Sequence, residues 1–195
     1  MSNPLSLKLQ NKRLILASGS PRRKELLEAL AIPFVIETRE VNEVYPMHLQ
    51  GAEITDYLSE LKAGAFQTLP QDTIIITSDT IVWLDGKALT KPKDRGEAIA
   101  ILQELSGKKH EVFTSVCIKS SSKTRVFSDV TKVYFKELNS EEIQFYVDHY
   151  RPYDKAGAYG AQDWIGYIGI EKLEGSYFNV MGLPVHKLYT ELMKW

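Results

Sequence analysis

The segment LILASGSPRRKELLEAL, residues 14–30, joins an apolar run to a helical pattern through a glycine-serine turn. Its first three residues, all leucine or isoleucine, are typical of a short buried strand. Ser20 followed by Pro21 predicts a helix N-cap and a first helical position, because proline's missing N–H costs nothing there. The segment therefore predicts a strand, a tight turn and a helix beginning at residue 21.

Two arginines lie in the first turn of this predicted helix. Arg22 and Arg23 fall at the positive end of the helix dipole, where each cation is disfavoured by roughly 0.3–1 kcal/mol. The backbone N–H groups of residues 18–20, the Ser18 hydroxyl and the two guanidinium groups could together bind an anion. Phosphate is the obvious candidate. The alternative, in which both arginines point into water, stays open at this stage.

The composition limits the possible classes of protein. The chain has 195 residues, is 44% hydrophobic and carries a net charge of −1, so it can bury a core but shows no general nucleic-acid or membrane surface. Its one cysteine, Cys117, excludes an internal disulfide and lies in an apolar segment, which predicts a buried position. No apolar run approaches ~18 residues, and no signal-peptide pattern is present. We expect a soluble cytoplasmic protein with no nucleic-acid partner and no membrane partner.

The chain alternates strand and helix patterns, which predicts a mixed α/β fold with parallel strands early and antiparallel ribbons late. The β-branched run TIIITS, residues 73–78, predicts a strand covered on both faces. A hairpin with its turn at Asp85-Gly86 is expected next. Further expectations are helices over 53–66, 94–105 and 140–150, an antiparallel pair formed by 110–119 and 123–135, a second ribbon over 164–182 with its turn near Glu174-Gly175, and a last helix opened by Pro184.

Asp79 directly follows the predicted buried strand, so we expect it at the strand's carboxyl end, where open α/β sheets bind ligands. The alternative is that it caps the following hairpin. Lys91 precedes Pro92, which restricts it to extended geometry, and the hairpin returns it toward Asp79. A lysine there could meet phosphate oxygens. Lys62 lies at the margin of an apolar helical stripe, and its pattern alone favours a solvated surface lysine.

The sequence offers only a few candidate residues for binding a metal ion or a nucleotide base. Asp79, Glu43 and Glu40 are candidate ligands, because a triphosphate normally arrives with Mg²⁺ and Mg²⁺ prefers oxygen. Most loop glutamates bind nothing, and the four histidines are scattered, with no metal spacing. The loop YDKAGAYGAQ, residues 153–162, suits a close approach to a ligand. The Gln162 amide would match the N3–H and O4 of thymine or uracil, unless the loop is only a packed turn with Gln162 exposed.

Seven motifs occur in order between Ala17 and Pro184: ASGSPRRKELL, the Lys-Ala of ELKAGAF, TSDT, KPKDRGEA, SGKKHEVFTSV, YDKAGAYGAQ and GSYFNVMGLP. Together they resemble the Maf family of nucleotide pyrophosphatases. The variants SPRR, SDT and GAYGxQ resemble the branch that acts on dTTP and UTP, rather than the branch that prefers 7-methyl-GTP. The resemblance implies a fold similar to the Maf/inosine-triphosphatase group: an elongated mixed sheet in a single domain, residues 1–195, with two lobes and a central cleft.

The resemblance also implies roles for individual residues. Asp79 matches the catalytic proton acceptor, and with Glu43 it is the expected metal-binding pair. Two departures are visible, since Thr90-Lys91-Pro92 replaces a common Gly-Lys-Pro, and Val41-Asn42-Glu43 replaces Val-Asp-Glu. The phosphate-cleft positions are matched by Ser18, Arg22, Arg23, Lys62 and Lys91, and the positions linked to base preference by Arg22, Thr80 and Gln162.

The expected activity is hydrolysis of dTTP and UTP, and of modified pyrimidine nucleotides, between the α- and β-phosphates. Mg²⁺ or Mn²⁺ would assist, and Asp79 would orient and deprotonate the attacking water. The resemblance suggests a homodimer, and it leaves open whether the physiological role is cleansing of the nucleotide pool or control of cell division. Two alternatives remain. One is a nucleotidyltransferase, which passes the nucleotide to an acceptor. The other is a regulator of septum formation that binds nucleotide without turnover.

Overall fold

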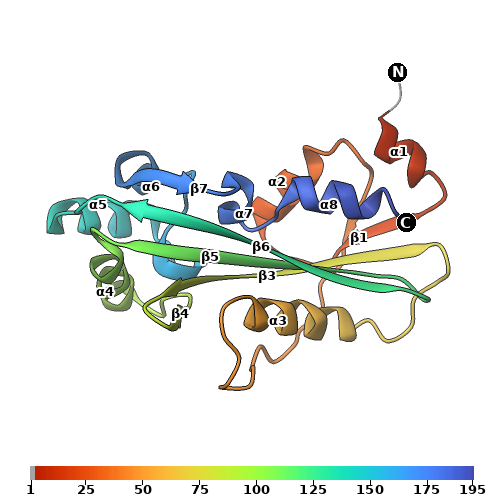
Figure 1. Ribbon diagram of the computed structural model, residues 1–195, viewed down its shortest axis with the longest axis horizontal. Coiled ribbons are helices and arrows are strands. Elements are labelled where there is room, and N and C mark those ends of the chain that lie inside the picture. The colour runs from red at the N-terminus through yellow and green to blue at the C-terminus, as the bar shows by residue number, and fades with distance from the viewer. Residues whose placement is uncertain (1–2) are drawn as a thin grey trace. The chain divides into compact units, whose positions relative to one another are not determined.

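The structure, a computed structural model, describes residues 3–195 and has the mixed α/β architecture predicted from the sequence (Figure 1). Over these residues the strands form one sheet in the order β2-β1-β3-β5-β6-β7, with β4 paired to β3. The chain divides into two compact units. Unit 1 comprises the described chain up to Asp79 together with Thr114–Asp129 and Gly182–Trp195, and unit 2 comprises Thr80–Phe113 and Val130–Met181.

Unit 1 begins with the strand-turn-helix expected from residues 14–30. Strand β1 pairs in parallel with both of its neighbours, matching Leu16 to Ile36 of β2 and to Ile76 of β3. Helix α2 begins at Pro21, and the Ser20 side chain accepts the backbone N–H of Arg23, so the predicted N-cap is confirmed. The elements of unit 1 are α1 (Pro4–Lys8), β1 (Arg13–Leu16), α2 (Pro21–Glu28), β2 (Val35–Ile36), α3 (Ala52–Gly64), α8 (Val185–Leu192) and parts of β3 (Thr73–Leu84), β5 (Lys109–Lys119) and β6 (Thr124–Phe135).

Helices cover both faces of the sheet in unit 1. Ile15 and Ile75 are paired in register, and paired residues of neighbouring strands point to the same face of a sheet. On that face they pack with Cys117 and with Ala63 of α3. Helices α2 and α8 lie on the side opposite α3 (Figure 1). Cys117 is fully buried, as predicted, and burial raises the pKa of its thiol to about 12.

Strand β3 is longer than the sequence suggested, and this corrects the expected position of Asp79. Residues 73–84 form a single strand, so Asp79 lies within β3 and not beyond its end. The pairing with β1 stops at Ile76, where β1 gives way to the glycine-serine turn. Asp79 therefore lies beyond the paired part of its neighbour. Asp79 thus lies near the glycine-serine turn, as the parallel pairing of β1 and β3 predicted, although β3 continues beyond it.

Unit 2 contains the predicted hairpin and an apolar core that includes Val82, Leu102 and Val133. Strand β4 pairs with β3 in antiparallel fashion, and the turn residues Asp85 and Gly86 have positive φ values of 49° and 84°. The further elements are α4 (Arg95–Leu105), α5 (Ser140–Tyr150), the 3₁₀ turn η1 (Ala156–Ala158), α6 (Trp164–Gly169), β7 (Ile170–Glu174) and α7 (Tyr177–Met181). Within residues 3–195, no helix combines the length and apolar character that crossing a membrane would require.

The second ribbon predicted over residues 164–182 is wrong except for its central strand. Only β7 is extended, and it pairs with β6 in antiparallel fashion, matching Leu173 to Val133. The flanking segments are the helices α6 and α7. Isoleucine and tyrosine favour strands locally, but contacts distant in sequence decide otherwise here. In α7, the buried Asn179 amide donates to the carbonyl of Val112 and to the hydroxyl of Thr131, both at 3.0 Å.

Candidate functional site

Unit 1 brings two carboxylates to one ammonium group. The Nζ atom of Lys62 lies 2.5 Å from Oδ1 of Asp79 and 3.1 Å from Oε2 of Glu43. The Asp79 and Lys62 side chains are only 9% and 16% exposed, whereas Glu43 is 49% exposed. The arrangement is therefore a sheltered ion pair with a second, half-exposed carboxylate at its rim.

Lys62 reaches this position because of its place on α3. It follows Leu58 by four residues, so the two side chains lie on the same face of the helix, and Leu58 is buried. The aliphatic stem of a lysine can run along such a face while its ammonium group meets a polar partner. The interpretation of Lys62 as a solvated surface lysine is therefore wrong.

Arg23 connects three separate segments of unit 1. Its Nε donates to the carbonyl of Gly182 at 2.9 Å, and its Nη1 donates to the carbonyl of Ser78 at 2.8 Å and to the Ser18 hydroxyl at 3.3 Å. Burial lowers the pKa of this guanidinium and Arg22 lowers it further, while Asp79 and Glu43 act in the opposite direction. An arginine nevertheless stays charged. Arg23 thus orders the turn after β1 and the residue that precedes Asp79.

The glycine-serine turn is partly satisfied by its own side chains. The Ser18 hydroxyl accepts the backbone N–H of Ser20 at 3.3 Å, as well as the Arg23 guanidinium. A side chain added at Gly19 would meet no atom within 4 Å, so the turn has open space beside it. Arg22 follows in the first turn of α2 and is half-buried. The turn therefore offers room and positive charge in the same place, while the Ser20 N–H is already bonded.

Unit 2 holds the remaining predicted site residues. Thr80 follows Asp79 along β3, and Lys91 is exposed just after β4. The Gly157 N–H donates to the carbonyl of Thr90 at 3.2 Å, so the glycine-rich loop lies beside the segment that carries Lys91. A Cβ built on Gly157, whose φ is +69°, would lie 2.6 Å from the Val82 side chain. This glycine is therefore required by packing within the protein itself.

Gln162, at the end of this loop, is not exposed. The residue is half-buried, and its Oε1 atom is buried with no hydrogen-bond partner among residues 3–195. A buried amide oxygen without a partner is unfavourable, because it has lost its hydrogen bonds to water. The expectation that Gln162 would be exposed is therefore wrong, and its buried amide oxygen has an unused capacity to accept a hydrogen bond.

The donor set near Asp79 fits a divalent cation that arrives with phosphate. In the described part of the chain, no group of three or more histidine, cysteine, aspartate or glutamate side chains is arranged to hold a metal ion. Mg²⁺, however, is commonly bound by one or two carboxylates together with substrate phosphates and water. Asp79 and Glu43, which share the ammonium of Lys62, match that requirement. Glu40 is exposed on the same loop.

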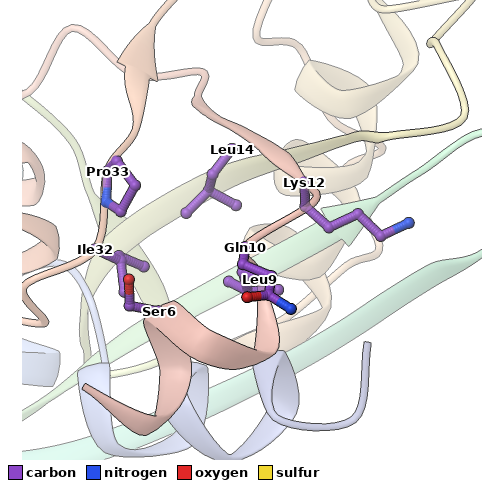
Figure 2. Close-up of a pocket in the computed structure, with 7 residues that line it drawn as sticks. All are labelled: Ser6, Leu9, Gln10, Lys12, Leu14, Ile32 and Pro33. Atoms are coloured by element: carbon purple, nitrogen blue, oxygen red, sulfur yellow. The ribbon is translucent and has the colours of Figure 1, made fainter. Parts of the chain in front are cut away.

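Unit 1 also contains a hollow of about 280 Å³ between α1, β1 and the segment after α2 (Figure 2). Its lining includes no acidic side chain and no residue of the set around Asp79. Lys12 is its one charged lining residue. The hollow is therefore distinct from the candidate site, and it is lined by Ser6, Leu9, Gln10, Lys12, Leu14, Ile32 and Pro33.

The chain is similar to known proteins in sequence and in fold. The sequence profile of the Maf-like protein family matches residues 13–195. A dTTP/UTP pyrophosphatase of Flavobacterium psychrophilum is 51% identical over 190 residues, covering 97% of each chain. One from Christiangramia forsetii is 53% identical over 185 residues, covering 94% of each chain. The solved structure of a HAM1 protein from Coxiella burnetii is similar in fold, with a TM-score of 0.51 at 14% identity over 94% of this chain and 100% of that chain.

Proposed function

Because this chain belongs to the Maf-like protein family, we propose that it is a nucleoside triphosphate pyrophosphatase that hydrolyses dTTP and UTP to the monophosphate and pyrophosphate. Two relatives that are about half identical over nearly their full length carry this activity in their names. The structural observation that carries the proposal is the sheltered Asp79–Lys62 pair next to the glycine-serine turn. The pair supports Asp79 as the base, because the cationic side chains of Lys62 and Arg23 lie close to its carboxylate.

Asp79 orients the attacking water and accepts its proton. The ammonium of Lys62 fixes the carboxylate in the unliganded protein. In the complex it also donates to a phosphate oxygen, so the Asp79 carboxylate gains a hydrogen-bonding position for water. The carboxylate of Glu43 holds the Lys62 ammonium in a position from which it reaches both Asp79 and the phosphate oxygen.

The phosphate chain is held by positive charge and by one hydroxyl. Arg22, Lys62 and Lys91 neutralise charge that builds up on the phosphate oxygens, which is where most of the catalysis of phosphoryl transfer arises. Ser18 donates its hydroxyl from the turn. Arg23 adds its charge to this site, and its hydrogen bonds to Ser18 and to the backbone keep the turn in place.

A divalent cation, Mg²⁺ or Mn²⁺, would be held by Asp79 with Glu43 as a second carboxylate. When bound, such a cation supplies positive charge that polarises phosphoryl oxygens. The two carboxylates remain within reach of Lys62, so that ammonium group competes with the cation for them.

Base preference is assigned to Arg22, Thr80 and Gln162. The Gln162 amide pairs with the N3–H and O4 of thymine or uracil, and its buried, unpartnered Oε1 supports this role. Resemblance to the family further supports a homodimeric, single-domain cytoplasmic enzyme that cleanses the nucleotide pool.

The test is pyrophosphate release from a panel of nucleoside triphosphates with Mg²⁺ and with Mn²⁺. We expect release from dTTP and UTP without any acceptor, and a loss of at least ~100-fold in turnover for Asp79→Asn, the low end for removal of a general base. Glu60→Gln, which removes an exposed carboxylate from α3, should keep wild-type turnover.

Three other outcomes would change the conclusion. Near wild-type turnover in Asp79→Asn would remove Asp79 from its role. Release only in the presence of an acceptor would identify a nucleotidyltransferase. Saturable nucleotide binding without any release would identify a binding regulator.

A further inference from the structure

Three polar side chains that the proposed reaction does not use meet around the glycine-rich loop of unit 2. The Tyr146 hydroxyl donates to Oδ2 of Asp163 at 2.7 Å and accepts the backbone N–H of Gly160 at 3.1 Å. The Nζ atom of Lys155 lies 3.7 Å from the same Oδ2 of Asp163. Lys155 lies near the start of this loop, residues 153–162, and Asp163 directly follows it, so the network holds both ends of the loop.

The Asp163 side chain does not make the hydrogen bond that is usual for an aspartate at a helix N-cap. Asp163 is the N-cap residue of α6, with φ −86° and ψ 169°, yet its side chain makes no hydrogen bond to the helix. An aspartate at an N-cap normally accepts an N–H from the first turn of its own helix. Here the carboxylate is directed instead to Tyr146, which lies on α5, and the interaction with the loop replaces the local one.

The network is buried and closely packed. Tyr146 is completely buried, and burial followed by the hydrogen bond to Asp163 raises the pKa of its phenol, so the hydroxyl stays a donor. A Cβ added at Gly160 would lie 2.7 Å from Oδ2 of Asp163. The loop backbone therefore rests directly on the carboxylate, and the two cannot shift independently.

Gln162 lies between the two loop residues that this network holds. Gly160 is fixed through its N–H, and Asp163 through its carboxylate. The Gln162 amide oxygen is buried without a partner among residues 3–195, so its direction is set by the backbone that carries it and not by a hydrogen bond of its own. A displacement of the backbone at residue 160 or 163 would therefore turn the amide.

We propose that Tyr146 and Asp163 are positioning residues that aim the Gln162 amide and so set the preference for bases with an N3–H and an O4 over cytosine, which has neither. The inference rests on the proposed function, because it assumes that Gln162 reads the base. The phosphate-binding side chains of unit 1 take no part in this network. Loss of the network should therefore change the ratio of kcat/KM between bases more than it changes kcat at saturating dTTP.

The experiment compares kcat and KM for dTTP and dCTP in the wild type and in Tyr146→Phe. We expect the ratio of kcat/KM for dTTP to that for dCTP to fall about 10-fold, the effect of losing one buried hydrogen-bonding group. The fall should come mainly from a higher KM for dTTP. Asp163→Asn keeps an acceptor for Tyr146 and should retain most of the ratio, whereas Asp163→Ala should lose it. The double variant Tyr146→Phe/Asp163→Ala should lose little more, since both residues act through one network.

Tyr150→Phe is the matched control. Tyr150 lies on the same helix and stacks on Tyr146 with ring centroids 5.1 Å apart, but it is 43% exposed and lies outside the network. Its variant should keep the wild-type ratio. Circular dichroism confirms that each variant is folded, and if Tyr146→Phe does not fold, Asp163→Ala takes its place.

An unchanged ratio in Tyr146→Phe or in Asp163→Ala would overturn the inference and leave the proposed function standing. An equal fall in kcat/KM for both nucleotides would also overturn it, because a merely structural role gives that result. Absence of pyrophosphate release from every nucleotide in the wild type would overturn both.

Discussion

Lys62 joins two carboxylates, and this makes it the most informative single residue of unit 1. In Lys62→Met the stem is kept and the ammonium is lost, so Asp79 stays buried without its partner. Breaking a buried ion pair by removing one member costs about 3–5 kcal/mol. We expect a lower urea midpoint together with a loss of pyrophosphatase activity of at least ~100-fold, since the proposed reaction also uses this ammonium to bind a phosphate oxygen.

The comparison for this variant is Lys24→Met on α2, where an exposed lysine pairs with an exposed Glu28 at 3.5 Å. Surface pairs of this kind contribute little, about 0–1 kcal/mol, so neither property should change much. Equal behaviour of the two variants would contradict the role given to Lys62.

The sequence predicted the structural role of a residue where that role depends on its neighbours along the chain. The Ser20 N-cap and the placement of Arg22 and Arg23 in the first turn follow from rules that span four residues. The acceptors of Arg23 could not be predicted, because Ser78 and Gly182 lie 55 and 159 residues away in the chain. Lys62 was placed by resemblance only, although its spacing of four from the buried Leu58 was visible.

Helix α6 depends on a glycine that cannot be replaced. In Gly166→Ala the added Cβ would lie 2.1 Å from the carbonyl oxygen of Ala161 and 2.6 Å from its carbon, both backbone atoms that cannot move cheaply. Alanine favours a helix over glycine by roughly 0.5–1 kcal/mol, but overpacking costs about 1–3 kcal/mol and more against rigid atoms. We expect a net loss of stability in thermal unfolding.

Gly64→Ala is the opposite case. Gly64 is the last residue of α3, and an added Cβ there would meet nothing within 4 Å. Only the helix preference remains, so this variant should be as stable as the wild type or more stable. The prediction would be refuted if the two substitutions shifted the melting temperature in the same direction.

Elements fixed by local chemistry were predicted well. The hairpin at Asp85-Gly86, the cap at Asp94 and the helix beginning at Ser140 are all present. The continuation of β3 through Asp79 was missed because a buried carboxylate within a strand has no local signal. Helices α6 and α7 were missed because isoleucine and tyrosine favour strands locally, and because the buried Asn179 of α7 bonds to Val112 and Thr131, which are distant in the sequence.

Stability of the folded protein should depend on pH through a buried histidine. His110 is 1% exposed, its Nε2 lies 2.7 Å from the Tyr159 hydroxyl, and burial lowers its pKa from 6.5 to about 3. The folded state therefore keeps His110 neutral while the unfolded state takes up a proton below about pH 6.5. The stabilising contribution is present above that pH and is lost as the pH falls toward 3.

The loss amounts to about 1.4 kcal/mol per pH unit below the unfolded pKa, or about 2 kcal/mol at pH 5. The measurement is urea unfolding at pH 7 and pH 5 for the wild type and for His110→Gln, which has no titrating ring. The variant should lose less stability between the two pH values than the wild type. Parallel pH dependence in the two proteins would exclude His110 as the cause.

For the molecule as a whole, the sequence identified the α/β class from alternating patterns and the family from motifs spread over most of the chain. It also predicts that the chemistry lies on Asp79 and its cationic neighbours, and the structure brings Lys62 and Arg23 close to Asp79. It did not reveal how Tyr146 and Asp163 support the loop, because each member of that network has an ordinary local interpretation as a core tyrosine or a helix cap.

The burial of Cys117 has a consequence for the chemical reactivity of the protein. It is the chain's only thiol, and with a pKa of about 12 and no exposed surface it offers oxidants no thiolate to attack. The folded protein can therefore form neither a disulfide-linked aggregate nor a sulfenic acid through cysteine. Peroxide or a thiol-alkylating reagent should therefore leave this thiol unmodified as long as the protein stays folded.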